Sequence, residues 1–176
     1  MTTRRLPHQF RFQVIARWLT DNYSPRSAID VGGGKGLLAY LLNKQGWQVS
    51  VVDPVNQDLP HKYKDISLGR RLLISPEEKV TRIDLPFEEE MGKDTDLLIG
   101  LHAHGSNMKI MNACKIYNCD FLLLPCCVID EPIEIKPNIN WLDSLEEYAK
   151  DLGLPVQRNV FNFVGQGTAL YTHKLS

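Results

Sequence analysis

The chain has 176 residues, a formal net charge of -1 at pH 7 and 43% hydrophobic residues. This length and apolar content fit one domain with its own core, so we expect residues 1–176 to form a single domain. The near-neutral charge excludes a protein that binds nucleic acid through its whole surface, but it leaves room for local basic patches.

The sequence carries no pattern typical of export or membrane insertion. The first residues include arginines and no apolar core of a signal peptide. The longest apolar run, Phe121–Ile129, contains a proline and is too short to cross a bilayer. The four cysteines form no C-x-x-C pair, which favours reduced thiols over a disulfide framework. We therefore expect a cytoplasmic protein with no membrane association.

Helical and strand-like patterns alternate along most of the chain. The expected helices are 8–20, 36–45 (stopped by Gly46), 107–117 and 141–152. The expected strands are 27–31, 47–52, 79–83, 96–101 and 121–125. The run 96–101 has no apolar–polar alternation, as in a strand buried on both faces of a parallel sheet. Between Pro54 and Glu78 the pattern is poor, and no element is predicted there.

The end of the chain has a different pattern. Residues 158–164 and 168–173 flank Gly165-Gln166-Gly167, which is typical of a β-hairpin. Alternating β/α units form a parallel sheet through right-handed crossovers, and a terminal hairpin makes the last strand antiparallel. The pattern therefore predicts an α/β fold, with the strand order left open.

A glycine-rich turn follows the first expected strand. Asp30 is followed by glycines at alternate positions, Gly32, Gly34 and Gly36. Glycine lets the backbone turn sharply and lets a ligand approach it closely. Asp53 ends the neighbouring strand, where a carboxylate accepts hydrogen bonds from ribose hydroxyls. These residues predict a pocket for a nucleoside cofactor.

Other nucleotide motifs fail at named positions. A dinucleotide fingerprint starting at Gly32 needs a glycine where the chain has Leu37, which disfavours an NAD-dependent oxidoreductase. A phosphate-binding P-loop needs a glycine where the chain has Ile29. A glycine-rich turn without a ligand is the structural alternative.

The spacing of Asp30, the glycines and Asp53 resembles motifs I and II of class I S-adenosylmethionine-dependent methyltransferases. Asp96–Gly105, with the sequence DLLIGLHAHG, resembles the "D-L-[LV]-x-G-L-H-A-C-G" segment of a methyltransferase group that includes tRNA 2′-O-methyltransferase-like and methyltransferase-25-like proteins. Phe121–Cys127 resembles that group's strand ending in P-C-C. The resemblance covers roughly Ala28 to Val128.

The resemblance implies a Rossmann-like fold, with a mostly parallel seven-stranded sheet that ends in an antiparallel hairpin. It implies S-adenosyl-L-methionine as the cofactor and Asp84 as the partner of the adenine amine. The expected cofactor-binding residues are Asp30, Gly32, Gly34, Gly36, Asp53 and Asp84.

Two departures from the group concern the reaction. His104 stands where the group has cysteine, and no aromatic–histidine pair follows Cys127. These departures support an alternative to an active enzyme, namely a catalytically idle domain that binds the cofactor or serves as a scaffold. The chain also lacks the [DNS]-P-P-[YFW] segment of amino-methylating enzymes, which disfavours methylation of adenine nitrogen.

Candidate catalytic residues follow the strand 96–101. The carboxyl ends of parallel strands line the ligand crevice, so His102 and His104 are expected near its mouth, with Pro125, Cys126 and Cys127 after the neighbouring strand. Histidine titrates in the range suited to a general base. We expect His102 to face the acceptor, beyond reach of the adenosine. The alternative is a histidine that only holds the local backbone.

Two histidines and two cysteines near one crevice also raise the question of zinc. Their spacings, H-x-H and C-C, differ from the usual chelating pairs. Adjacent strand residues point to opposite faces, so Cys126 and Cys127 cannot both reach one ion without a bend in the chain. The sequence therefore favours small apolar roles for these cysteines and no metal site.

The acceptor is not specified by the sequence. Basic side chains cluster in the N-terminal segment and again between residues 62 and 71, where they would contact RNA phosphates or simply face solvent. A chain of this length leaves little room for a separate recognition domain. We therefore expect RNA or a small molecule as acceptor, with a partner protein as a possible source of recognition.

Overall fold

The computed structural model describes residues 4–24, 26–127, 129–134, 137 and 139–173. Its centre is a seven-stranded sheet of order β5-β2-β1-β6-β7-β9-β8. The first five strands in this order are parallel, and β9 is antiparallel to both β7 and β8. In sheet order the strands are Thr81–Ile83, Gln48–Val52, Ser27–Val31, Leu97–Leu101, Asp120–Leu124, Thr168–Thr172 and Val156–Val160. The α/β class and the antiparallel end predicted from the sequence are confirmed.

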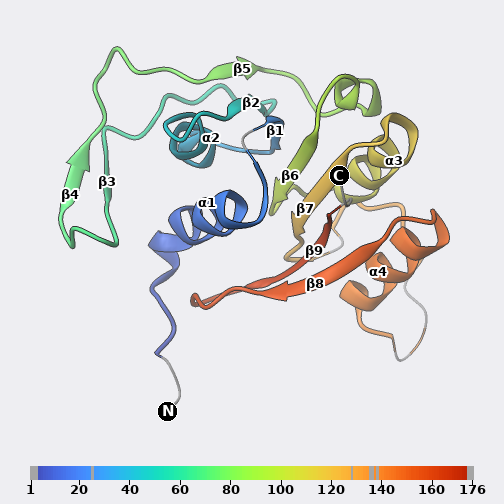
Figure 1. Cartoon of the computed structure of the whole chain (residues 1–176). Helices are drawn as coiled ribbons and strands as arrows, with labels where there is room; N and C mark the ends of the chain where they lie inside the picture. The colour runs from blue at the N-terminus through green and yellow to red at the C-terminus, as the bar shows by residue number, and fades with distance from the viewer. Residues whose placement is uncertain (1–3, 25, 128, 135–136, 138, 174–176) are drawn as a thin grey trace.

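Helices cover both faces of the sheet (Figure 1). The helices α1 (Arg11–Asn22) and α2 (Leu37–Asn43) pack on one face. The helices α3 (Asn107–Tyr117) and α4 (Trp141–Asp151) pack on the other. Short 3-10 helices, η1 (His8–Phe10) and η2 (Glu89–Gly92), precede α1 and β6.

The central strands β6 and β7 are buried along their whole length. Neighbouring residues of β7 belong to different cores, since Leu122 packs with α1 and α2 while Phe121 packs with α3 and α4. Burying such a side chain contributes roughly 1.5–3 kcal/mol. Two apolar faces fix the register of the strand and hold the carboxyl ends of β6 and β7 side by side.

The second helix is shorter than the predicted 36–45. Gly36 lies outside it at φ 76°, and the helix ends at Asn43. The Asn43 side chain exchanges two hydrogen bonds with the backbone of Val49, on β2. That contact competes with a further helical turn, and Gly46 at φ 85° then reverses the chain.

The terminal hairpin is present, but its turn is longer than predicted. The strands β8 and β9 pair Val156 with Thr172 and Val160 with Thr168, so residues 161–167 form the connection. The aromatic rings of Phe161 and Phe163 lie buried in the core beneath α1 instead of continuing the strand. The predicted strand 158–164 was therefore wrong in both bounds.

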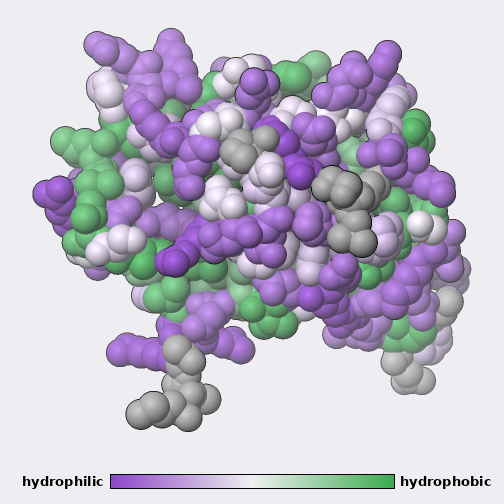
Figure 2. Space-filling view, in the orientation of Figure 1, coloured by the Kyte–Doolittle hydropathy of each residue, from purple (hydrophilic) through white to green (hydrophobic). Residues whose placement is uncertain are grey.

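A second, two-stranded sheet lies in the region where no element was predicted. Its strands are β3 (Lys62–Lys64) and β4 (Arg71–Leu73), paired antiparallel. Gln13 of α1 holds it through both ends of its amide, donating to the carbonyl of Lys64 and accepting from the N–H of Ile66. Figures 1 and 2 show this hairpin at the edge of the molecule, where Leu73 is 82% exposed.

Among the described residues, no helix is long and apolar enough to cross a membrane.

Candidate cofactor site

The glycine-rich turn between β1 and α2 has a backbone conformation that residues with a side chain rarely adopt. Gly32, Gly34 and Gly36 have φ values of 65°, 52° and 76°. A Cβ on Gly33 would lie 2.5 Å from Oδ2 of Asp30. The turn therefore needs glycine for its conformation at three positions and for space at the fourth.

Asp53 holds this turn in place from the end of β2. One carboxylate oxygen accepts a hydrogen bond of 2.9 Å from the N–H of Gly34, and the other accepts one of 2.8 Å from the N–H of Val55. Asp53 is 8% exposed. The carboxylate that the sequence predicts to bind ribose thus orders the glycine turn.

A cavity of about 390 Å³ lies against the glycine turn. Its volume falls in the range of roughly 300–1,000 Å³ found for small-molecule sites. It is lined by Arg11, Phe12, Asp30, Gly32, Gly33, Gly34, Lys35, Leu37, Pro60, Leu101 and His102. The cavity lies at the carboxyl ends of β1 and β6, as expected for a ligand site in a doubly wound sheet.

Two charged groups of opposite sign border this cavity, each with an atom that lacks a partner. Oδ1 of Asp30 and Nε of Arg11 are buried without a hydrogen bond. Burial, then repulsion from Asp53, raises the pKa of Asp30 to about 7, against partial opposition from Arg82. Buried polar atoms are rarely left unpaired, so Asp30 and Arg11 are an acidic and a basic side chain at this cavity whose hydrogen-bonding capacity is not fully used.

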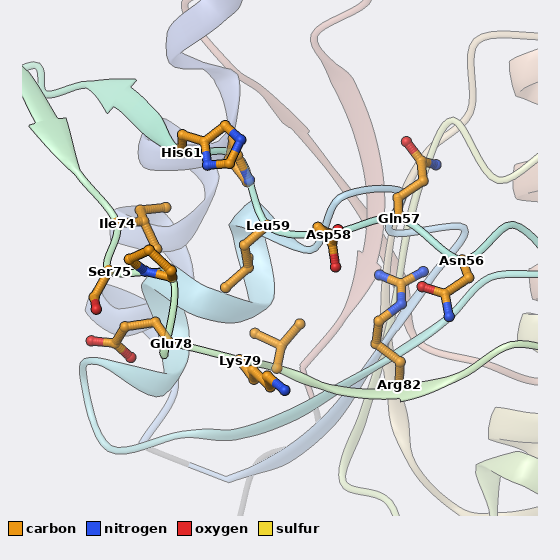
Figure 3. A pocket seen from close by; sticks show the side chains of 13 residues that line it. Asn56, Gln57, Asp58, Leu59, His61, Ile74, Ser75, Glu78, Lys79 and Arg82 are labelled. Carbon is orange, nitrogen blue, oxygen red and sulfur yellow. The ribbon is translucent and has the colours of Figure 1, made fainter.

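Arg82 is a residue of the site that the sequence did not reveal. Its guanidinium donates to the carbonyl oxygens of Gly34 (2.7 Å) and Val55 (3.0 Å), and it pairs with Asp84 at 3.4 Å. Figure 3 shows it beside Asn56 and Gln57, at one end of a second cavity of about 460 Å³. One side chain thus links the ends of β1, β2 and β5.

The other predicted cofactor residues lie outside the first cavity. Asp84 is largely exposed at the end of β5 and accepts a hydrogen bond of 2.8 Å from Asn56. Gly36 is the N-cap of α2, and a Cβ there would lie 2.8 Å from Cγ2 of Val80. The structure therefore gives Gly36 a packing role and leaves Asp84 accessible beside Arg82.

His102 lines the same cavity as the glycine turn. It has φ 61°, and its N–H donates to the carbonyl of Leu124, which joins the ends of β6 and β7. Burial lowers its pKa, as do the charge of Arg11 and the neighbouring His8 and His104. A lowered pKa keeps the imidazole neutral near pH 7, the form that accepts a proton. His102 thus shares a cavity with Asp30 and the glycines, whereas Asp53 and Asp84, the residues expected at the adenosine, do not line it.

His104 lies in a different cluster. Its Nε2 is 2.9 Å from Sγ of Cys126 and 3.6 Å from Sγ of Cys127, and the two sulfur atoms are 3.6 Å apart. The two cysteines meet at one point because the strand ends at Leu124, so the alternation of faces no longer applies after Pro125 and the chain has the bend that such a meeting requires. Burial, then the hydrogen bond with Cys127, raises the pKa of the Cys126 thiol.

Part of this chain is similar in sequence to known proteins. A "Probable tRNA (uracil-O(2)-)-methyltransferase" of Caenorhabditis elegans is 34% identical over 104 residues, which are 58% of this chain and 17% of that protein. The Homo sapiens protein of the same name is 28% identical over 111 residues, 60% of this chain and 13% of that protein. The chain thus spans less than a fifth of these curated relatives. No protein-family model matches it.

The fold is shared more widely. Magnesium protoporphyrin IX methyltransferase from Synechocystis, solved with bound SAM, superposes with a TM-score of 0.59 over 95% of this chain and 80% of that one, at 13% identity. This chain has the class I methyltransferase fold. The resemblance found in the sequence is confirmed at the level of fold and of distant relatives.

Proposed function

We propose that this chain is a methyltransferase domain that binds S-adenosylmethionine and methylates an oxygen of RNA. The observation that carries the proposal is that Asp30 and Arg11 both line the cavity at the glycine turn, each with one buried atom that lacks a hydrogen bond. The cofactor's methionine part has an ammonium for Asp30 and a carboxylate for Arg11. NAD has no such amino-acid group, so the pair favours S-adenosylmethionine over the oxidoreductase alternative.

The remaining residues have roles that follow from their positions. Gly32 and Gly34 line the cavity without side chains, so the cofactor would approach their backbone closely. Asp53 orders the turn in which they lie. Asp84, accessible at the end of β5, would accept from the adenine amine, with Arg82 fixing its position. Bound S-adenosylmethionine supplies a methyl group on a sulfonium, which is already activated for transfer.

His102 is the candidate general base of this chain. It lines the cavity, and its lowered pKa leaves Nδ1 or Nε2 free to accept a proton near neutral pH. An acceptor hydroxyl that loses its proton to His102 as the methyl group arrives avoids a positively charged product oxygen. Proximity to the cofactor contributes the rest of the rate.

Two observations support RNA as the acceptor. The relatives that match this chain are named for tRNA methylation. The two basic segments of the sequence also lie together, because Gln13 joins α1 to the β3–β4 hairpin. Exposed cations on these elements are Arg17, Lys62, Lys64, Arg70 and Arg71. Such a patch holds phosphates without reading sequence, so we propose that a partner protein or a further segment selects the nucleotide, in the cytoplasm.

The experiment is transfer of label from radioactive S-adenosylmethionine to total RNA, to purified tRNA and to a metabolite extract. We expect label in tRNA at a 2′-O-methylated nucleoside, identified after nuclease digestion. Label confined to small molecules would contradict the RNA acceptor. Tight cofactor binding without any label, in the presence of a cell extract that supplies partners, would instead support an idle domain.

A further inference from the structure

The His104–Cys126–Cys127 cluster lies outside the cavity described above, and the proposed methyl transfer does not use it. His104 comes from the loop between β6 and α3, and both cysteines come from the loop after β7. All the potential ligand atoms lie within 4.8 Å of one another, and no other group of three such residues lies as close in the described ranges. We propose that these three side chains form a zinc site with one coordination position open.

The ligand loops are held together on both sides of the cluster. The N–H of His102 donates to the carbonyl of Leu124 (3.2 Å), just before the cysteines, and the N–H of Gly105 donates to the carbonyl of Ile129 (3.2 Å), just after them. The backbone of both loops is therefore ordered by contacts that do not involve the three ligands.

Glu131 adds a third link between the loops. One of its carboxylate oxygens accepts from the N–H of Asn107 at 2.7 Å, and the other accepts from the N–H of Met108 at 3.1 Å. It thereby caps α3, whose first turn lies directly after the His104 loop. A scaffold fixed in this way gives the ligands little entropy to lose when an ion binds.

Two of the three distances between ligand atoms match those of a tetrahedral zinc site. Zinc–sulfur bonds of ~2.3 Å and zinc–nitrogen bonds of ~2.1 Å place two sulfur atoms about 3.8 Å apart and sulfur about 3.6 Å from nitrogen. The structure has 3.6 Å between the two sulfur atoms and 3.6 Å from Cys127 Sγ to His104 Nε2. The remaining edge, 2.9 Å to Cys126, needs to open by about 0.7 Å. The His104 side chain is exposed, so its ring has room for that movement.

The donor set selects the kind of ion. Two thiolates and one imidazole suit zinc and disfavour magnesium or calcium, which take oxygen ligands. Three protein ligands with a fourth position open to water is the pattern of zinc sites that bind an exogenous ligand, whereas purely structural sites have four. The open position lies at the carboxyl edge of β6 and β7, on the same edge of the sheet as His102.

Metal binding is tested without any methyl donor, so its result is separate from that of the proposed function. Protein purified under reducing conditions is stripped with a chelator and titrated with Zn²⁺ and, in parallel, with Co²⁺. We expect about one ion per chain and a cobalt spectrum with thiolate charge-transfer and strong d–d bands, which report tetrahedral sulfur ligation.

Variants identify the ligands. Cys126→Ser, Cys127→Ser and His104→Ala should each weaken Zn²⁺ binding about tenfold or more. The matched controls are His61→Ala, an exposed histidine elsewhere, and the double variant Cys114→Ala/Cys119→Ala, which removes the buried thiols. Both controls should bind Zn²⁺ like the parent chain.

Three results would overturn the site. One is a parent chain that shows no tetrahedral cobalt spectrum and retains no zinc. Another is cobalt binding that survives loss of Cys126 and Cys127 but disappears with loss of Cys114 and Cys119. The last is a disulfide between Cys126 and Cys127 that persists in protein purified under reducing conditions. The parent spectrum decides the question even where a variant folds poorly.

Discussion

The Oδ2 atom of Asp53 accepts a hydrogen bond of 2.9 Å from the N–H of Gly34, which joins the end of β2 to the middle of the glycine turn. Two features that the sequence presents separately are therefore one unit in the structure. If Asp53 binds the proposed cofactor, a change at Asp53 should act both on that contact and on the backbone of the glycine turn.

Asp53→Ala should weaken S-adenosylhomocysteine binding roughly ten- to a hundred-fold, because a charge-assisted hydrogen bond contributes about 1.5–3 kcal/mol. It should also lower the melting temperature, since two loop hydrogen bonds are lost. Calorimetric titration and thermal denaturation measure the two effects. The control is Asp58→Ala, an exposed acid of the neighbouring segment. Unchanged affinity in folded Asp53→Ala would remove Asp53 from the site.

Substitutions at two glycines with similar backbone conformations distinguish backbone strain from an effect on cofactor binding. Gly34 (φ 52°) and Gly69 (φ 64°) both have room for a Cβ, since the nearest atom to one is 3.8 Å away and nothing lies within 4 Å of the other. Alanine at either position should destabilise the fold by roughly 1–2 kcal/mol. Only Gly34→Ala should also weaken cofactor binding, and Gly34→Val should abolish it. Equal affinities for the Gly34 and Gly69 alanine variants would contradict a ligand at the turn.

Arg11 should bind the carboxylate at the amino-acid end of the cofactor. Arg11→Gln is expected to weaken S-adenosylhomocysteine binding about tenfold or more, since a charge-assisted contact is lost. It should leave binding of 5′-methylthioadenosine, which lacks the amino-acid group, nearly unchanged. Arg17→Gln, at a side chain 83% exposed on the same helix, is the control. A similar loss for both ligands would mean that Arg11 acts on the fold instead.

Asp30 should make stability depend on pH. Its pKa of about 7 in the folded chain lies above the ordinary 3.8, so between those values the folded state binds more protons than the unfolded state. Stability therefore falls as pH rises from about 4 to about 7, by up to about 1.4 kcal/mol per unit, and levels off above. Denaturant titrations across this window should show that decline, and Asp30→Asn should remove it.

Cofactor binding should show the opposite trend at the same residue. A ligand ammonium favours ionised Asp30, so affinity should rise as pH increases from about 6 to about 8, with release of a proton. Binding enthalpies in buffers of different ionisation enthalpy measure that proton. Proton uptake, or the same pH dependence in Asp30→Asn, would contradict the proposed contact.

Much of the fold was predictable because burial leaves a clear pattern. The runs that became β6 and β7 are apolar on both faces, and the predicted 107–117 coincides with α3. The β3–β4 hairpin left no such pattern, since its three-residue strands are mostly exposed and Gln13 of α1 holds it in place. Long-range contacts of that kind are not visible in local sequence.

The site was predictable in its loops and less so in its charges. The glycines and Asp53 stand at a recognisable spacing. Arg11 and Arg82 are ordinary basic residues of a helix and a strand until the fold places Arg11 at the cavity and Arg82 against Gly34. The one available signal for Arg82 was its position just before Asp84 at a strand end. The meeting of Cys126 and Cys127 was not predictable, because the end of the strand at Leu124, which allows the bend, is set by the fold.

His102 is tested with a substitution suited to its backbone. At φ 61° asparagine is tolerated better than alanine, so His102→Asn keeps a polar side chain and removes the base. We expect single-turnover methylation of tRNA to fall ~10²–10⁴-fold with cofactor affinity reduced much less. A rate equal to that of the parent chain would show that His102 holds the backbone only.

The central claim, an S-adenosylmethionine site at the glycine turn, is tested most directly by calorimetric titration of the parent chain with S-adenosylmethionine, S-adenosylhomocysteine and NAD. The account predicts saturable one-site binding of the first two ligands, loss of that binding in Gly34→Val, and no binding of NAD. Binding of NAD alone would contradict it.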